Sequence, residues 1–288
     1  MTRWTLITDV QFGHADPDEE TNSRRARYMI EKIAGEAPDF VINAGDSING
    51  GVVDGERRKV KKLWAQYQDA IRPLDNVCPL ITVIGNHDQT GEAATSEDFC
   101  RETGRIGKQP YFSKTIGGVN VVVLHTMPGR HGGGFPDGTP QLRWLRNHLQ
   151  RPRQSKCTIV CGHYPIFVNP WLYHTSDPSL HYDENRNEQG VLLPILLDSE
   201  VDMYLCGHHH VYERSSYKGL TQVMGGALGI AYEEQLEKPP HRYSKVLDER
   251  QCYVRFTLDE KAISGESVDL DGNVIDSWMQ TLNRSQSK

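Results

Sequence analysis

Five short apolar segments of this chain end in the same way, which leaves few folds open to it. Each segment has the length and composition of a buried β-strand, and a turn carrying oxygen or imidazole side chains follows it. The five endings are Asp9-Val10-Gln11, Gly45-Asp46, Gly85-Asn86-His87-Asp88, Gly162-His163 and Gly207-His208-His209-His210. Because open α/β sheets place their sites where strands end, the pattern predicts one site built by several strands.

Helical patterns separate the first of these strands. Apolar residues recur at helical spacing over residues 26–33 and again over residues 60–71, where Pro73 ends the run. A third helix is predicted to begin at Thr139, an N-cap residue that Pro140 follows. Strands that alternate with helices in this way are typical of parallel pairing in an α/β protein.

Other segments indicate antiparallel pairing. Residues 111–116 and 119–125 flank Gly117-Gly118 and read as a β-hairpin, and residues 251–258 and 262–270 have the same character. The sheets are therefore expected to be mixed.

Composition excludes several classes of protein. The 288 residues contain no apolar run near the length of a membrane helix, and 32 basic against 38 acidic residues give a net charge of -6, which argues against a nucleic-acid partner. The six cysteines include no Cys-x-x-Cys pair. The first residues show no charged-then-apolar leader, so we expect a cytoplasmic protein, although a secreted protein whose leader had been removed would start the same way.

The strand endings together offer a set of metal ligands. They supply two Asp, one Gln, one Asn and three His side chains, enough to hold two divalent ions with one carboxylate bridging them. Any one such string is a common turn sequence, but five in order are not easily coincidental.

The order and spelling of these strings resemble those of the calcineurin-like metallophosphoesterase superfamily, from Asp9 to His210. The resemblance implies an α/β fold, an α/β/β/α sandwich of two mixed sheets flanked by helices, with residues 1–288 as a single domain. It also implies a dinuclear-metal-dependent hydrolase of phosphoric esters or anhydrides.

Different motifs resemble different branches of the superfamily. Residues 162–165 and 207–214 are similar to purple and tartrate-resistant acid phosphatases, whereas Asp9-Val10-Gln11 with the downstream arginines resembles manganese-dependent ADP-ribose/CDP-alcohol diphosphatases. A purple phosphatase has a metal-binding Tyr three residues after the Asp of its second motif. Asn49 stands there in this chain, so an iron(III)-tyrosinate centre is not expected.

The resemblance assigns roles to individual residues. One metal ion is implied to have the ligands Asp9, Gln11, Asp46 and His210. The other is implied to have the ligands Asp46, Asn86, His163 and His208. Mn or Fe is expected and Zn is possible, and Gln11 either binds metal or only hydrogen-bonds a ligand. A metal-bridging hydroxide is implied as nucleophile, with His87 as general acid and Asp88 orienting its ring.

The expected substrate is a small phosphorylated or nucleotide-like molecule. Five residues are candidate substrate contacts: Arg24, Arg25, Asn49, Tyr164 and Arg214. For Arg24 and Arg25 a solvated first helical turn is an equal alternative. Residues 165–189 form a long polar connection, a candidate lid or substrate loop.

Several functions remain open from the sequence. The enzyme is a phosphomonoesterase or a nucleotide-type diphosphatase or phosphodiesterase. Alternatives are a catalytically inactive, metal-stabilised binding or regulatory protein and a metal-dependent nuclease, which the net charge disfavours. The oligomeric state does not follow from the sequence.

Overall fold

The computed structural model of the chain describes residues 1–14, 18–50, 57–89, 95–105, 107–126, 138–169, 188–230 and 240–282. The α-helices in these residues are α1 (Glu19–Glu36), α2 (Arg57–Ile71), α3 (Ser96–Glu102), α4 (Pro140–Leu149) and α6 (Leu193–Asp198). A 3-10 turn at Arg72–Leu74 follows α2, and a π-helical turn at Glu188–Leu192 precedes α6.

The strands form two mixed sheets. The first contains β1 (Thr2–Ile7), β2 (Phe40–Asn43), β3 (Leu80–Thr82), β11 (Cys252–Leu258), β12 (Ala262–Asp269) and β13 (Val274–Thr281). The second contains β4 (Phe112–Ile116), β5 (Val119–Val123), β6 (Cys157–Cys161), β7 (Met203–Cys206), β8 (Tyr212–Tyr217), β9 (Leu220–Gly225) and β10 (Ser244–Asp248). Their orders are β13-β12-β11-β1-β2-β3 and β10-β8-β9-β7-β6-β5-β4.

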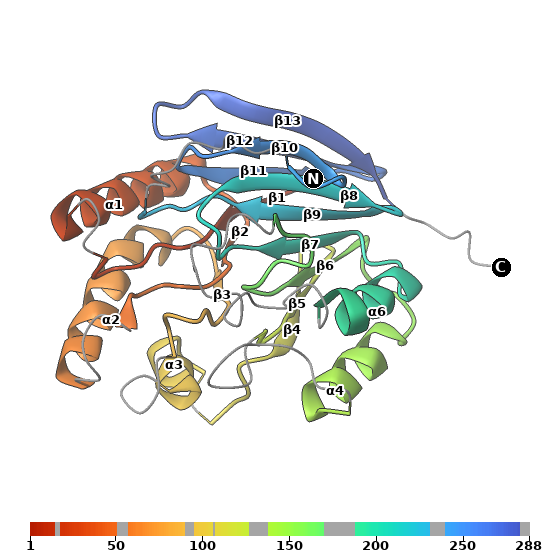
Figure 1. Ribbon diagram of the computed structural model, residues 1–288, viewed down its shortest axis with the longest axis horizontal. Coiled ribbons are helices and arrows are strands. Elements are labelled where there is room, and N and C mark those ends of the chain that lie inside the picture. Colours follow the sequence, from red (N-terminus) through yellow and green to blue (C-terminus); the bar gives the residue numbers. More distant parts are fainter. Residues whose placement is uncertain are drawn as a thin grey trace.

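Successive side chains of a strand face opposite sides of the sheet, and this divides the apolar core into three layers. In β6, Ile159 faces the other sheet, whereas Val160 faces outward with α4 and α6. In β2, Ile42 faces inward in the same way, and Val41 packs with α1 and α2 on the outer face of the first sheet. The result is two sheets face to face with helices outside each, as Figure 1 shows.

The predicted fold class is confirmed. Strands at residues 40–43 and 157–161, the hairpin around Gly117-Gly118 and the helix that Thr139 caps all lie where the sequence placed them. Parallel pairing of β1 with β2 and of β2 with β3 in one sheet, and of β5 with β6 and of β6 with β7 in the other, brings the strand endings together.

Other expectations differ from the structure. The predicted hairpin at residues 251–270 adds to the sheet of β1 through antiparallel pairing of β11 with β1, and strands β8 and β9 were not expected. The predicted lid at residues 165–189 falls mostly on residues 170–187, which lie outside the described residues.

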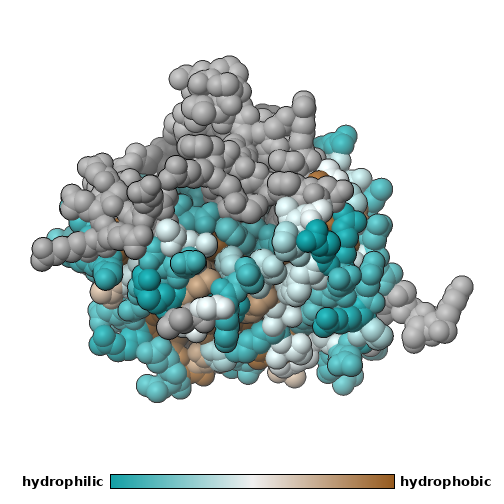
Figure 2. Space-filling model, turned by 90° about the horizontal axis from the view of Figure 1, so that it is seen from below, coloured by the Kyte–Doolittle hydropathy of each residue, from teal (hydrophilic) through white to brown (hydrophobic). Residues whose placement is uncertain are grey.

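Polar residues cover most of the described surface seen in Figure 2, with hydrophobic residues only in small patches between them. Among the helices that the structure describes, none has both the length and the apolar character needed to cross a bilayer.

Candidate metal centre

The backbone at the strand ends adopts an unusual conformation. Asp9, Gln11, Asp46, His208 and His210 all have positive φ angles between 42° and 84°, the left-handed region that non-glycine residues seldom occupy. Such conformations persist where surrounding contacts impose them, and they cluster at functional sites. We therefore attribute the left-handed backbone of the strand endings to the contacts within the site.

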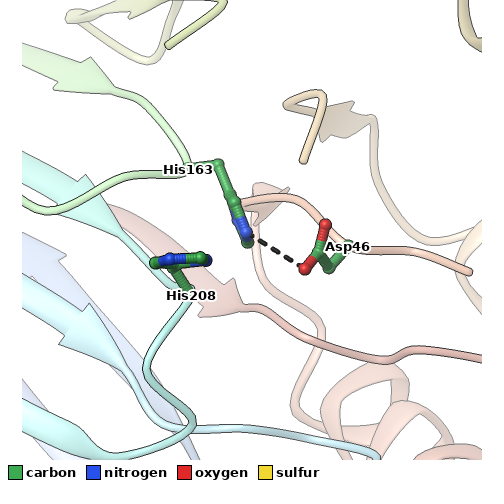
Figure 3. A group of neighbouring side chains, drawn as sticks. All are labelled: Asp46, His163 and His208. Carbon is green, nitrogen blue, oxygen red and sulfur yellow. Dashed lines mark ion pairs between the residues drawn. The ribbon is translucent and has the colours of Figure 1, made fainter. Parts of the chain in front are cut away.

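Asp46, His163 and His208 form the centre of this site. One ligand atom from each lies within 4.8 Å of the others, and His163 Nε2 is 3.1 Å from Asp46 Oδ2. Figure 3 shows the His163 ring and the Asp46 carboxylate pointing toward one another, with His208 beside them. His163 Nδ1 is 2.9 Å from the carbonyl oxygen of Ala44, a contact that directs Nε2 toward Asp46.

Asn86 joins the two imidazoles. Its Oδ1 is 2.9 Å from His163 Nε2 and 3.0 Å from His208 Nδ1. One amide oxygen and two ring nitrogens thus converge beside Asp46, as the sequence predicted for one of the two ligand sets.

Asp9, Gln11 and His210 form the other side of the cluster. Gln11 Nε2 donates to Asp46 Oδ2 at 3.1 Å and is 3.3 Å from His210 Nε2. His210 Nε2 is 3.6 Å from Asp9 Oδ1. The other oxygen of Asp9 accepts hydrogen bonds from Thr8 Oγ1 at 2.7 Å and from the His208 backbone N–H at 3.0 Å. Both predicted ligand sets are therefore assembled around Asp46.

Gly85 permits the closest approach of two strand endings. A Cβ atom at Gly85 would lie 2.0 Å from Asp46 Oδ1 and 2.3 Å from the Asp46 backbone nitrogen. Any larger residue at this position would therefore displace the Asp46 carboxylate. The glycine of the third string thus lets the turn that carries Asn86 lie directly against Asp46.

Burial and mutual charge set the protonation of the cluster. Burial acts to lower the pKa of His163, but the Asp46 carboxylate prevails and raises it to about 10, and the same pairing lowers the pKa of Asp46. Burial raises the pKa of Asp9 to about 6 and lowers that of His210 to about 3. Burial likewise keeps the pKa of His208 well below its usual value. The imidazoles of His208 and His210 are therefore neutral, as metal-ligating imidazoles must be.

His87 differs from the residues around it in its exposure. Its side chain is 34% exposed, and its Nε2 lies 4.0 Å from Asp46 Oδ2, whereas Asp46 is buried. The backbone N–H of His87 donates to Asp46 Oδ1 at 2.8 Å, so the position of His87 is coupled to that of the central carboxylate.

Asp88 does not orient His87, contrary to the sequence-based expectation. Its Oδ1 accepts the backbone N–H groups of Ser47 and Ile48 at 2.9 and 3.2 Å, and its Oδ2 accepts that of Gly85 at 2.9 Å. Because three backbone donors hold the carboxylate, Asp88 instead ties the turn that carries Asp46 to the turn that carries Asn86. Burial, and next the Asp46 charge, raise the pKa of Asp88 to about 8.

Supporting residues that the sequence did not single out come from α2 and from the ends of β2 and β5. Tyr67 of α2 accepts a hydrogen bond from Asn43 Nδ2 at 2.9 Å, and Asn43 Oδ1 accepts the Gly45 N–H just before Asp46. On the other sheet, Thr126 Oγ1 accepts the backbone N–H groups of His163 and Tyr164. A tyrosine on a helical stripe reads as core in a sequence, so only the structure reveals this role.

The donor set fits divalent metal ions. Asp9 Oδ1 and Gln11 Oε1 are buried and accept no hydrogen bond from the described residues, although a buried acceptor without a partner is costly. A cation bound between them would supply what both lack. Carboxylate and amide oxygens combined with imidazoles suit Mn, Fe and Zn, so the residues present agree with such a group.

A comparison with protein families decides what kind of protein carries this site. The model of the calcineurin-like phosphoesterases matches residues 2–212. The chain belongs to the calcineurin-like phosphoesterase family. Calcineurin-like phosphoesterases are metal-dependent hydrolases of phosphoric esters, and the predicted superfamily is confirmed.

Relatives of this phosphoesterase include phosphatases. Human serine/threonine-protein phosphatase CPPED1 is 28% identical over 240 residues, which cover 81% of this chain and 72% of the human protein. In structure, the chain resembles purple acid phosphatase PPD1 from yellow lupin, with a TM-score of 0.71, 19% identity and 97% of this chain covered. It spans 53% of that longer chain. A dimetal phosphatase from Danio rerio matches with a TM-score of 0.65, 15% identity and coverage of 98% of this chain and 99% of that one.

The predicted substrate contacts of this phosphoesterase lie in different surroundings. Tyr164 is buried, and its ring centroid lies 4.3 Å from that of His208, beside the metal centre. Asn49 is 2% exposed, and its backbone N–H donates to the Phe12 carbonyl oxygen. Both side chains are therefore buried, and Tyr164 lies directly beside a predicted ligand.

The three arginines differ in exposure and in their partners. Arg24 is exposed on α1, where it lines a surface groove with Tyr28, and Arg25 is half-buried on the same helix. Arg214 is held by Asp276 of β13, with 2.6 Å from Nε to Oδ2 and 3.2 Å from Nη2 to Oδ1. The expectation that Arg214 contacts substrate finds no support, because its guanidinium joins the two sheets.

Proposed function

We propose that this calcineurin-like phosphoesterase hydrolyses phosphomonoesters at a centre of two divalent ions, with His87 as general acid. The observation that carries the proposal is the position of His87, a partly exposed imidazole directly beside a buried ligand cluster. A group that reaches both solvent and the cluster is placed to donate a proton to a leaving alkoxide.

The side chains around Asp46 would divide between the two ions as the sequence predicted. Asp46 Oδ2 faces His163 on one side and Gln11 on the other, which supports a bridging role for this carboxylate. When bound, two divalent ions supply activation of water and neutralisation of the phosphoryl oxygens. Mn or Fe(II) is the proposed metal and Zn is possible, because an amide oxygen is a harder ligand than an imidazole.

The chain's own residues hold this arrangement in place. The bond from the His87 backbone N–H to Asp46 Oδ1 fixes the distance between the proposed acid and the bridging carboxylate. Asp88 fixes the same turns through Ser47 and Gly85. The Tyr164 ring packs against the His208 ring, with 4.3 Å between centroids, and supports its position.

The human relative supports a monoester substrate, because its name describes it as a serine/threonine-protein phosphatase. A phosphorylated serine or threonine has a strongly basic alkoxide as leaving group, which is the case in which a general acid contributes most. A second candidate, a nucleotide-type diphosphatase, is favoured by Gln11, which lies within the cluster as the Asp-x-Gln motif of such enzymes would require.

A matrix of metals and substrates distinguishes these functions. Metal-stripped protein is reconstituted anaerobically with Mn, Fe(II), Zn or Mg and assayed on p-nitrophenyl phosphate, its bis ester, ADP-ribose and a phosphoserine peptide. Asp46→Asn, purified in parallel, measures contaminating phosphatase. We expect the monoesters to be hydrolysed fastest with Mn or Fe(II). Hydrolysis of ADP-ribose alone would establish the diphosphatase, and no hydrolysis above the Asp46→Asn background would indicate a binding protein.

A further inference from the structure

A cavity lies at the end of β6 opposite to the metal centre. Its volume is about 610 Å³, and it is lined by Thr115 and Asn120 of the β4–β5 hairpin, by most of residues 148–155, and by Thr158 and Ser199. Thr158 is near the start of β6, and His163 follows the end of that strand. At a rise of ~3.3 Å per residue the two ends are roughly 16 Å apart, so the cavity is separate from the metal cluster.

The charge of this cavity is opposite to that of the chain. The chain has a net charge of -6, yet residues 146–156 contain two Arg that line the cavity, two further cations and no acidic residue. Asp198 and Glu200 flank Ser199 in sequence, but neither side chain lines the cavity. A hollow in an acidic protein that presents only cationic charges attracts anions.

The two lining arginines have different partners. Arg153 pairs with Asp202, which is fully buried and also accepts the Thr158 N–H at 2.8 Å, so Arg153 is held in a fixed orientation and its charge is compensated. Arg151 forms no ion pair with any described residue. Within the described part of the chain its positive charge is therefore uncompensated at the cavity, and it outweighs the partial negative charge at the carbonyl end of α4.

Neutral donors surround these charges. His148 is half-buried, its ring stacks on that of Trp144 with 5.5 Å between centroids, and its Nε2 is 3.3 Å from Asn120 Nδ2. Burial, and next the charge of Arg151, lower the pKa of His148, so its imidazole is neutral. The hydroxyl groups of Thr115, Ser155 and Ser199 add donors that rotate to suit an acceptor.

We propose that this cavity binds a phosphate-type oxyanion, either free or as the phosphoryl group of a monoester, independently of the metal centre. A tetrahedral oxyanion accepts several hydrogen bonds at once, and a guanidinium fork with adjacent hydroxyl groups supplies them. This binding site does not depend on the proposed function, because none of its lining residues belongs to the metal cluster.

The test is a titration of the full-length, Zn-loaded protein followed by amide chemical shifts in NMR spectra. Inorganic phosphate, sulfate, acetate and phosphoserine are titrated separately. We expect the amides of residues 148–158 to shift with phosphate in a saturable way, and to do so equally in Asp46→Asn, whose metal centre is disrupted. Phosphoserine is titrated into Asp46→Asn, which does not hydrolyse it, and so distinguishes an esterified ligand from free phosphate.

Two substitutions complete the test. Arg151→Ala removes an exposed side chain that has no ion pair to the described residues, so it should leave folding intact and weaken phosphate binding at residues 148–158 about tenfold or more. Lys61→Ala removes an exposed cation of α2 and should change nothing. The proposal is overturned if phosphate shifts only amides near Asn86, His163 and His208, if acetate binds as well as phosphate, or if Arg151→Ala binds like the wild type.

Discussion

Asp46 and His163 come from different sheets and meet with 3.1 Å between Oδ2 and Nε2, and neither side chain reaches solvent. Asp46 follows β2 of the six-stranded sheet, and His163 follows β6 of the seven-stranded sheet. The proposed catalytic centre therefore depends on the packing of one sheet against the other.

The first prediction concerns the central carboxylate. Asp46→Asn should lower kcat/KM by at least about 100-fold, whereas Gln11→Ala should lower it about tenfold, because Asp46 faces both ligand sets and Gln11 only one. Steady-state kinetics at saturating metal, with metal content measured for each variant, provide the comparison. Equal residual rates would contradict a bridging role for Asp46.

The second prediction isolates His87. His87→Ala should cost about 10²–10⁴-fold on esters with strongly basic alkoxide leaving groups and far less on esters of acidic phenols, which leave without a proton. The measurement is kcat/KM across esters of graded leaving-group pKa. A uniform loss on all esters would show that His87 orients substrate or supports the ligands instead.

The third prediction follows from the bonds of Asp88. In Asp88→Asn one acceptor oxygen becomes an NH₂ group that faces a backbone donor, so the variant should lose about 2 kcal/mol of unfolding free energy and bind metal about 10–100-fold more weakly. Urea unfolding and competition with a metal chelator measure the two effects.

A matched control for Asp88 is Asp259→Asn. Asp259 also accepts two backbone N–H groups, from Lys261 and Ala262, but on the exposed turn between β11 and β12. Its substitution should leave metal affinity unchanged. Asp88→Asn could instead retain normal metal affinity and only steepen the dependence of kcat/KM on the pKa of the leaving group. That result would support the expectation that Asp88 orients His87.

The fourth prediction uses two glycines. Gly85→Ala should abolish metal binding, because the added Cβ would lie 2.0 Å from Asp46 Oδ1. Gly35→Ala, within α1, meets no atom within 4 Å and should stabilise the protein by about 0.5–1 kcal/mol through helix propensity. Metal analysis and thermal unfolding of both variants check this, and a Gly85→Ala protein with full metal content would refute it.

The fifth prediction concerns the proton that His163 releases when metal binds. The pKa of His163, raised from 6.5 to about 10 by Asp46, means that the metal-free protein carries a proton there at neutral pH. A ligating imidazole must be neutral, so metal binding should release about one proton, and the apparent affinity should rise as pH increases toward 10. Calorimetry at pH 7.5 in buffers of different ionisation enthalpy counts the protons. No dependence on the buffer would count against His163 as a ligand.

Some strands could be predicted from the sequence and others could not, for physical reasons. Strands such as β2 and β6 are buried on both faces, so a continuous apolar run reveals them. Strand β8 was missed because its buried positions include Glu213 and Ser215, whose polarity hides the strand. Glu213 is fully buried with a hydrogen bond from Asn169, a partner that no local pattern reveals.

Two side chains have partners that the sequence did not indicate. Asp88 was expected to orient its sequence neighbour His87, and its carboxylate accepts hydrogen bonds from backbone groups 40 and 41 positions away. Arg214 was a candidate substrate contact, and its partner Asp276 lies 62 positions along the chain. Residue type and spacing can indicate a ligand set, whereas the partner of a charged side chain depends on tertiary contacts.

The contact between Gln11 and His210 joins residues 199 positions apart, so the ligand set is complete only when nearly the whole chain has folded. A folding intermediate with only the first three strands in place would hold Asp9, Asp46 and Asn86 but no histidine from β6 or β7. During synthesis the ions would therefore be acquired late, after β7 has emerged. Metal content per chain would then report the fraction of molecules that have completed folding.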